Sequence, residues 1–242
     1  MGEVFWILLV AAAGPVIGSL AGVAFRPRPG AMGCMLAFAG GVMLAISFLE
    51  LLPESTAKSG LPGAAAGLAV GFLVMAALEC LLPRTQGAPA SAPGRDLRRA
   101  SVLMILAIFL HNLPEGMAIA ASTVMEDPRA LVTVAFAIAI HNIPEGICTS
   151  APYYYATGKR LGAFLRSSST ALPVLAGFWL GRVLLLDANP FATGTMVATA
   201  AGLMIHISCQ ELIPAALEEG SPLASMAWLM GGVVFVLLLG AL

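Results

Sequence analysis

Residues 101–122 read SVLMILAIFLHNLPEGMAIAAS, and residues 131–152 read LVTVAFAIAIHNIPEGICTSAP. Each stretch has about the 20 mostly apolar residues that a helix needs to cross the hydrocarbon core of a bilayer. Each also carries the same polar hexapeptide, H-N-[LI]-P-E-G, in its middle. The two stretches therefore predict two membrane-spanning helices that share a polar motif.

The rest of the chain has the same apolar character. Of its 242 residues, 59% are hydrophobic and only 10% are charged, whereas a soluble domain carries roughly 25% charged residues. The sequence predicts an all-α polytopic membrane protein that forms a single transmembrane domain over residues 1–242. Eight apolar runs are long enough to span a bilayer, at 4–25, 31–53, 62–82, 100–124, 129–156, 161–186, 192–217 and 223–242. Prolines in the fifth and sixth runs predict kinks there.

The basic residues predict an orientation, because positive charge gathers on the cytoplasmic side of membrane proteins. The first, third and fifth loops hold most of it, at Arg26, Arg28, Arg84, Arg95, Arg98, Arg99, Lys159 and Arg160. We therefore expect both termini to lie outside the cytoplasm. The third loop, 83–99, is rich in Pro, Gly, Ala and Arg and is expected to be a flexible cytoplasmic linker. Since the net charge is -1, nucleic-acid binding is not expected.

Ionisable side chains inside membrane spans are costly and mark sites or pathways. His111 and Glu115 lie in the fourth span, and His141 and Glu145 lie in the fifth. In each motif, His and Glu are four residues apart and share one helical face. Two neighbouring helices would thus bring two imidazoles and two carboxylates to one point, a ligand set that suits zinc. Iron, manganese, cobalt and cadmium would also fit these donors. A purely structural polar network between the two helices is the alternative.

The seventh span adds three polar candidates. Glu211 is predicted to be a pathway residue or an auxiliary ligand. His206 and Gln210 are four residues apart and would share a helical face. His206 is either a ligand or a hydrogen-bonded core histidine.

The second span supplies three further candidates. Met43 would offer a thioether to the metal or simply pack in the core. Glu50 and Glu54, at the outer end of this span, would form an acidic entrance or a solvated helix end.

With the doubled H-N-x-P-E-G, the chain resembles the ZIP (Zrt/Irt-like) family of metal-ion transporters. The second span, from Gly41 to Glu54, and the seventh, from Gln210 to Pro214, are also similar to segments of that family. The resemblance implies uptake of metal toward the cytoplasm, a homodimer and an elevator-like movement of a helix bundle. It also implies that the transport site is lined by His111, Asn112, Glu115, His141, Asn142 and Glu145.

Two departures from the family pattern remove negative charge. Members with a two-metal site often have Asp where this chain has Asn142, and often Glu where the alignment places Leu172. We therefore expect one strong metal position, built from His111, Glu115, His141 and Glu145, with the second position weak or absent.

The sequence thus predicts a transporter of divalent metal ions, zinc first, in a bacterial inner membrane. It predicts no prosthetic group and no enzyme activity, with the metal ion as substrate and the lipid bilayer as surroundings. The alternative from another class is an intramembrane zinc-dependent hydrolase, but the H-E-x-x-H signature of many zinc proteases is absent. A metal-gated receptor or a structural membrane protein would bind metal without transporting it.

Overall fold

The computed structural model describes residues 2–24, 29–81, 95–123, 128–184 and 189–239. These residues form helices and short connections, with no strand among them. The α-helices are α1 (Gly2–Ala24), α2 (Pro29–Ile46), α3 (Leu52–Leu81), α4 (Arg95–Ser122), α5 (Pro128–Thr157), α6 (Arg160–Ser168), α7 (Leu172–Leu184), α8 (Pro190–Ile207), α9 (Ile213–Glu219) and α10 (Pro222–Leu239). Three short helices of other types join them: the π-helices η1 (Ser47–Leu51) and η3 (Ser208–Leu212), and the 3₁₀-helix η2 (Ser169–Ala171).

Proline marks the beginning of several helices. Pro29, Pro128, Pro190 and Pro222 each stand at the first position, where a missing N–H removes no intrahelical hydrogen bond and the fixed φ suits a helix. Before α8, the side chain of Asn189 also accepts a hydrogen bond from the Phe191 backbone N–H at 3.0 Å.

Three stretches of the described chain are long and apolar enough to cross a membrane: Val4–Ala24, Gly30–Leu81 and Pro190–Glu219. The second of these holds two predicted spans, because the helix continues beyond the expected end at residue 53 and breaks only at Gly60, whose φ is 66°. Shorter apolar helical stretches cover Ser101–Met117 and Pro222–Leu238. The number of eight crossings and the placement of both termini outside stay predictions.

The third loop is shorter than the composition suggested. Residues 95–99, expected to belong to the linker, form the first turns of α4. The last helix breakers before them are Pro93 and Gly94, and no Pro or Gly follows until Pro114, so the helix can begin at position 95. The remainder of the expected linker, 83–94, lies outside the described residues.

The sixth span is interrupted as its proline suggested. Pro173 has no N–H for the Ser169 carbonyl, and the chain passes through η2 between α6 and α7 at this point. In the fifth span, α5 continues through both Pro144 and Pro152, and the kink expected there stays a prediction.

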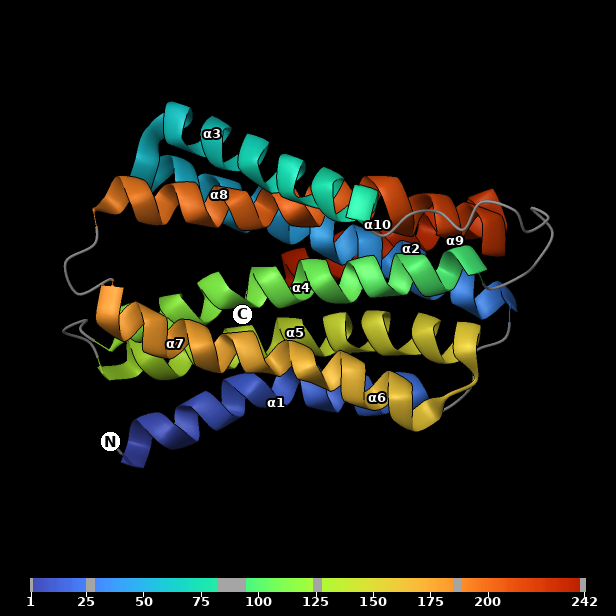
Figure 1. Ribbon diagram of the computed structural model, residues 1–242, viewed down its shortest axis with the longest axis horizontal. Coiled ribbons are helices and arrows are strands. Elements are labelled where there is room, and N and C mark those ends of the chain that lie inside the picture. The colour runs from blue at the N-terminus through green and yellow to red at the C-terminus, as the bar shows by residue number, and fades with distance from the viewer. Residues whose placement is uncertain (1, 25–28, 82–94, 124–127, 185–188, 240–242) are drawn as a thin grey trace.

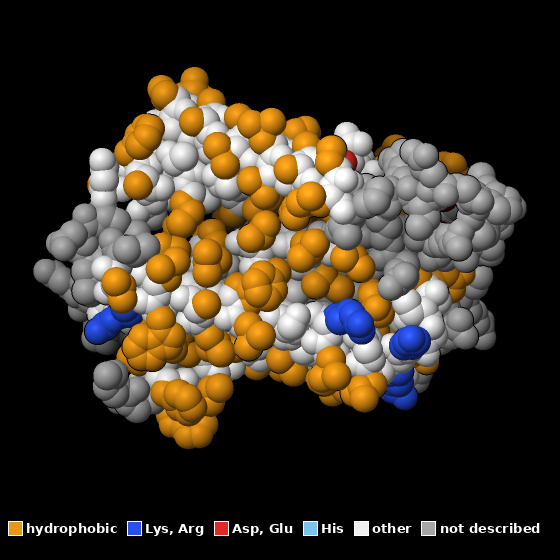
Figure 2. Space-filling view, viewed as in Figure 1, with side chains coloured by type: hydrophobic (Ala, Val, Ile, Leu, Met, Phe, Trp, Pro, Cys, Tyr) orange, Lys and Arg blue, Asp and Glu red, His pale blue; other side chains and the backbone are white. Residues whose placement is uncertain are grey.

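The exterior is apolar across the middle of the molecule. Large apolar side chains are exposed on several helices, among them Trp6, Leu73, Val183 and Leu223. Figure 2 shows hydrophobic side chains over the centre of one face, with the blue Lys and Arg side chains towards its two ends. This distribution is the one that a surface in contact with lipid requires.

The helices pack in two groups (Figure 1). One half contains α1, α4, α5, α6 and α7, and the other contains α2, α3, α8, α9 and α10. We call the surface where they meet the seam; its principal contacts join α4 to α8 and α2 to α5. At one end of the seam, the Tyr155 hydroxyl of α5 donates a hydrogen bond to the Glu219 carboxylate at the end of α9.

Glycines bring helix backbones into contact within each half. A Cβ at Gly18 of α1 would lie 2.1 Å from the Ile143 carbonyl oxygen of α5, and a Cβ at Gly71 of α3 would lie 2.2 Å from the Thr199 carbonyl oxygen of α8. Small residues permit such close packing of membrane helices. Each described glycine that makes a contact of this kind meets atoms of its own half. Side chains, rather than close backbones, therefore fill the seam.

Candidate functional site

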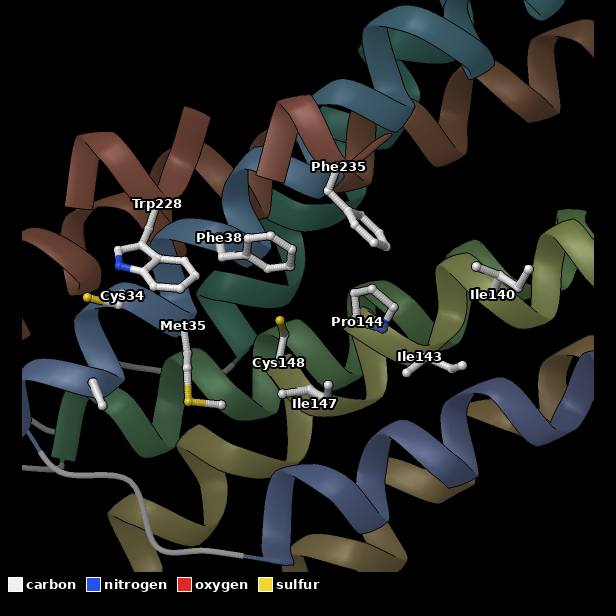
Figure 3. A pocket seen from close by; sticks show the side chains of 11 residues that line it. Cys34, Met35, Phe38, Ile140, Ile143, Pro144, Ile147, Cys148, Trp228 and Phe235 are labelled. Carbon is white, nitrogen blue, oxygen red and sulfur yellow. The ribbon is translucent and has the colours of Figure 1, made fainter. Parts of the chain in front are cut away.

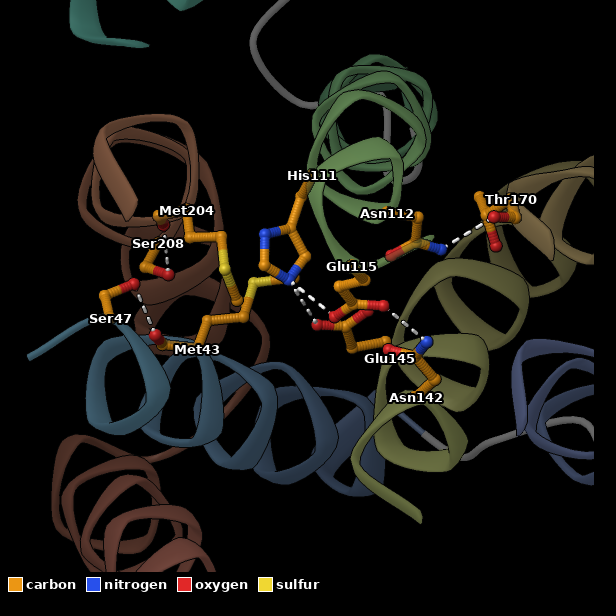
Figure 4. Close-up of polar contacts among 10 residues, drawn as sticks. All are labelled: Met43, Ser47, His111, Asn112, Glu115, Asn142, Glu145, Thr170, Met204 and Ser208. Atoms are coloured by element: carbon orange, nitrogen blue, oxygen red, sulfur yellow. Dashed lines mark hydrogen bonds and ion pairs between the residues drawn. The ribbon is translucent and has the colours of Figure 1, made fainter. Parts of the chain in front are cut away.

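The polar side chains of the first hexapeptide meet at the seam (Figure 4). His111 Nε2 lies 3.0 Å from Glu115 Oε1 on α4, which confirms that the two residues share a helical face. Both side chains are buried, with 1% and 7% of their surface exposed. In an apolar interior, such a pair is retained only where its charges and hydrogen bonds are balanced.

The second hexapeptide adds a carboxylate from α5. Glu145 Oε1 lies 3.9 Å from His111 Nε2, and Glu145 is also buried. The Asn142 side-chain amide donates a 2.8 Å hydrogen bond to Glu115 Oε2, so α5 also holds the carboxylate of α4. His141 lies on α5 in the same motif, but its side chain lies outside the described part of the structure.

The amide nitrogen of Asn112 points towards η2. It donates a 2.6 Å hydrogen bond to the Thr170 carbonyl oxygen. Two buried amide oxygens, Asn112 Oδ1 and Asn142 Oδ1, accept no hydrogen bond within the described structure. Buried polar oxygens normally have a partner, and an amide oxygen can ligate a hard or borderline cation.

The electrostatics of this cluster favour a cation. Glu115 and Glu145 both approach the single imidazole of His111, and two nearby carboxylates repel unless a proton or a cation lies between them. Among the described side chains, no three His, Cys, Asp or Glu residues surround a common point as a complete metal cage. The four-ligand centre that includes His141 thus stays a prediction.

The two candidates His206 and Gln210 of the seventh span differ in burial. His206 is buried, whereas Gln210 is exposed within the π-helix η3. The expectation that these two residues share a helical face stays a prediction. His206 Nε2 pairs with Glu79 Oε1 of α3 at 2.8 Å, and its ring packs edge-on against Phe72. Glu211 is partly buried within η3.

The acidic candidates of the second span lie on the surface. Glu50 is exposed within η1, and Glu54 forms an ion pair with Lys58 one turn later. Met43, by contrast, is buried and points towards the His111 imidazole (Figure 4). Met43 and Glu145 also line the same small void.

One residue near this cluster was missed. Met204 of α8 is fully buried. Figure 4 shows its thioether directed towards the thioether of Met43 and towards His111. An internal repeat would have identified it: residues 41–53 read GVMLAISFLELLP and residues 202–214 read GLMIHISCQELIP. The two methionines stand at the same position of this repeat.

An apolar cavity of about 640 Å³ lies beside the cluster, between α2 and α10 on one side and α5 on the other (Figure 3). Phe38, Trp228, Ile147 and Cys148 are among the residues that line it. No charged side chain lines this cavity, and its only potential metal ligands are the sulfur atoms of Cys34, Met35 and Cys148.

Comparison with known proteins places the chain in a family. A family profile described as ZIP Zinc transporter matches residues 84–240, which include both hexapeptides. The chain is 35% identical to the zinc transporter ZupT of Corynebacterium efficiens, over 95% of this chain and 92% of that protein. It is also 35% identical to the zinc transporter ZupT of Chlorobaculum parvum, over 95% of this chain and 93% of that protein. The chain therefore belongs to the ZIP family.

Proposed function

We propose that this integral membrane protein transports divalent transition-metal ions, zinc first, across a bacterial inner membrane toward the cytoplasm. Its membership of the ZIP family and its similarity to bacterial zinc transporters support the choice of substrate. The observation that carries the proposal is the buried convergence of His111, Glu115 and Glu145 at the seam. Iron, manganese, cobalt and cadmium suit the same donors.

The metal ion binds between α4 and α5. His111, Glu115, His141 and Glu145 are its principal ligands, with nitrogen and oxygen donors of the kind that zinc prefers. Asn112 and Asn142 line the site, and their buried amide oxygens are available to a bound ion or its water. Glu211 lies on the route of the ion, and the exposed carboxylates of Glu50 and Glu54 attract cations before they enter.

Charge balance favours this arrangement inside a membrane. Two ionised glutamates and one divalent cation sum to zero, whereas an isolated charge at membrane depth is costly. The loaded site would therefore be electroneutral.

The arrangement of the two halves supports an elevator-like movement. Backbone contacts at glycines hold each half together, while side chains fill the seam. The half that contains α4 and α5 would carry the ion and slide against the half that contains α2 and α8. The full transporter would have eight spans, both termini outside and a homodimeric assembly.

The test is zinc flux into liposomes that contain the purified protein. We expect His141→Ala and Glu145→Ala each to abolish zinc flux, because each removes a ligand. Glu218→Gln, which changes an exposed glutamate at the end of α9, is the matched control and should transport like the wild type.

The same assay separates the alternatives. Flux absent from the wild type, with zinc still bound at His141 and Glu145, would contradict transport and favour a receptor. Hydrolysis of lipid or peptide by the purified protein would favour the zinc hydrolase. Family membership counts against that alternative.

A further inference from the structure

The internal repeat gives Met43 and Met204 equivalent surroundings. In each copy, a serine four residues after the methionine begins a π-helix. Ser47 Oγ donates to the Met43 carbonyl oxygen at 2.8 Å, and Ser208 Oγ donates to the Met204 carbonyl oxygen at 2.7 Å. The hydroxyls satisfy carbonyls where the helical hydrogen-bond ladder widens. Both methionines are thereby held in the same local geometry.

Both thioethers face the cluster from across the seam. Met43 and Met204 are 1% and 0% exposed, respectively. They belong to one buried cluster that also contains Ala107 and Ile108, from the turn of α4 that precedes His111. In Figure 4, the two side chains point towards each other and towards the His111 imidazole. The wall formed by α2 and α8 thus presents sulfur, while the wall formed by α4 and α5 presents nitrogen and oxygen.

Thioethers suit this position chemically. A thioether is neutral and polarisable, so burying it inside a membrane costs far less than burying a charge. It prefers soft metal ions, whereas carboxylates also accept hard ones. A sulfur-bearing wall would therefore favour zinc and cadmium over manganese without adding charge to the site.

We propose that Met204 is a second thioether donor to the transported ion, paired with Met43 and placed by the same repeat. The ion at the His111 and Glu145 site then contacts sulfur from both α2 and α8, and these contacts determine the preference for softer ions. This inference rests on the proposed metal site of α4 and α5. The competing explanation is that both methionines only fill space.

X-ray absorption at the cadmium edge, on the purified cadmium-loaded protein, distinguishes these explanations. We expect sulfur scattering in the wild type, a loss of part of it in Met43→Leu and in Met204→Leu, and none in the double variant. Leucine closely matches the volume of methionine, so packing is largely retained. Met75→Leu, at a fully buried methionine of α3, is the matched control and should keep the whole sulfur signal.

Two additions make the outcome decisive. Cys148 also lies near Glu145, so every measurement is repeated in a Cys148→Ala background. Should Met204→Leu not fold, selenomethionine labelling of Met43→Leu replaces it, and cadmium–selenium scattering from that protein would support the proposal.

Transport should agree with the spectroscopy. The ratio of cadmium to manganese flux should fall severalfold in Met204→Leu and not in Met75→Leu.

The proposal is overturned if Met204→Leu keeps the wild-type sulfur signal, or if the labelled Met43→Leu protein shows no selenium beside cadmium. A wild-type spectrum with only nitrogen and oxygen would reject the thioethers and leave the His and Glu site intact. A spectrum unchanged by Glu145→Ala would instead reject the site itself.

Discussion

Asn142 contributes to the site by its side-chain amide nitrogen as well as by its amide oxygen. The amide donates to Glu115 Oε2 at 2.8 Å, and a hydrogen bond of this kind stabilises the ionised carboxylate without a second cation. The side chain is fully buried, so water does not compete for the bond. This contact gives a physical reason to expect a single strong metal position.

Replacing Asn142 with Asp should create a second position. The new carboxylate would face Glu115, and the repulsion between them favours another cation or a proton. We expect zinc binding to rise from about one ion to about two ions per chain, the second more weakly bound, as measured by calorimetry in detergent.

Asn142→Ala is the control, because it removes the amide without adding charge. It should weaken binding of the single ion and create no second position. Two ions of similar affinity in the wild type would contradict this account of Asn142.

Protons should compete with the metal at the same side chains. Imidazole ligands bind metal when neutral and carboxylates when ionised, so acid removes both kinds of ligand. Zinc flux should fall as the outside pH falls from neutral towards 5. The affinity for zinc should fall by at most about tenfold per pH unit for each proton displaced. Flux measured in proteoliposomes across this pH range tests whether acid lowers or raises zinc transport.

His206→Gln serves as the control for acid inhibition, because the Glu79–His206 pair lies away from the cluster, between α3 and α8. The variant should keep the same pH dependence. A flux that rises steadily towards acid would show proton coupling instead of competition.

At the scale of helices, stability depends on backbone contacts at glycines. Gly18→Ala would place a methyl group 2.1 Å from the Ile143 carbonyl oxygen, well inside van der Waals contact, and force α1 away from α5. Overpacking of this kind costs roughly 1–3 kcal/mol. We expect the melting temperature in detergent, followed by size-exclusion chromatography after heating, to fall by several degrees.

Gly30→Ala is the matched control, because no atom lies within 4 Å of the added methyl group. Alanine is the better helix former, so this variant should melt at the wild-type temperature or slightly above it. Equal melting temperatures for the two variants would mean that α1 and α5 are not held by this contact.

At the scale of the whole molecule, transport requires the two halves to move past each other. The Tyr155–Glu219 contact joins them at one end of the seam. Cysteines at these two positions, in a chain without its four native cysteines, can be joined by a bifunctional thiol reagent. We expect zinc flux to stop on cross-linking and to return when the linker is cleaved.

A cross-link within one half should not have this effect. The Arg160 side chain donates to the Ala24 carbonyl oxygen at 3.2 Å, between α6 and α1 at the ends of those helices. Cysteines at these two positions, joined by the same reagent, should leave the flux close to that of the unlinked protein. Full flux after linking Tyr155→Cys to Glu219→Cys would contradict movement at the seam.

The sequence by itself determined the helical, membrane-embedded class and the polar motif. Apolar run length and low charge are local properties of the chain, and His111 and Glu115 share a face through α-helical spacing alone. The prolines that begin four helices and the break at Gly60 also follow from local backbone chemistry.

Only the tertiary structure decided which polar residues meet. His206 could have been a ligand or a core histidine by sequence alone, and in the fold it is buried and pairs with Glu79 of α3. Met204, 93 positions after His111 in the sequence, reaches the cluster because α8 packs against α4. Such contacts arise between distant segments and depend on packing and helix register, which the periodicity of a single segment does not contain.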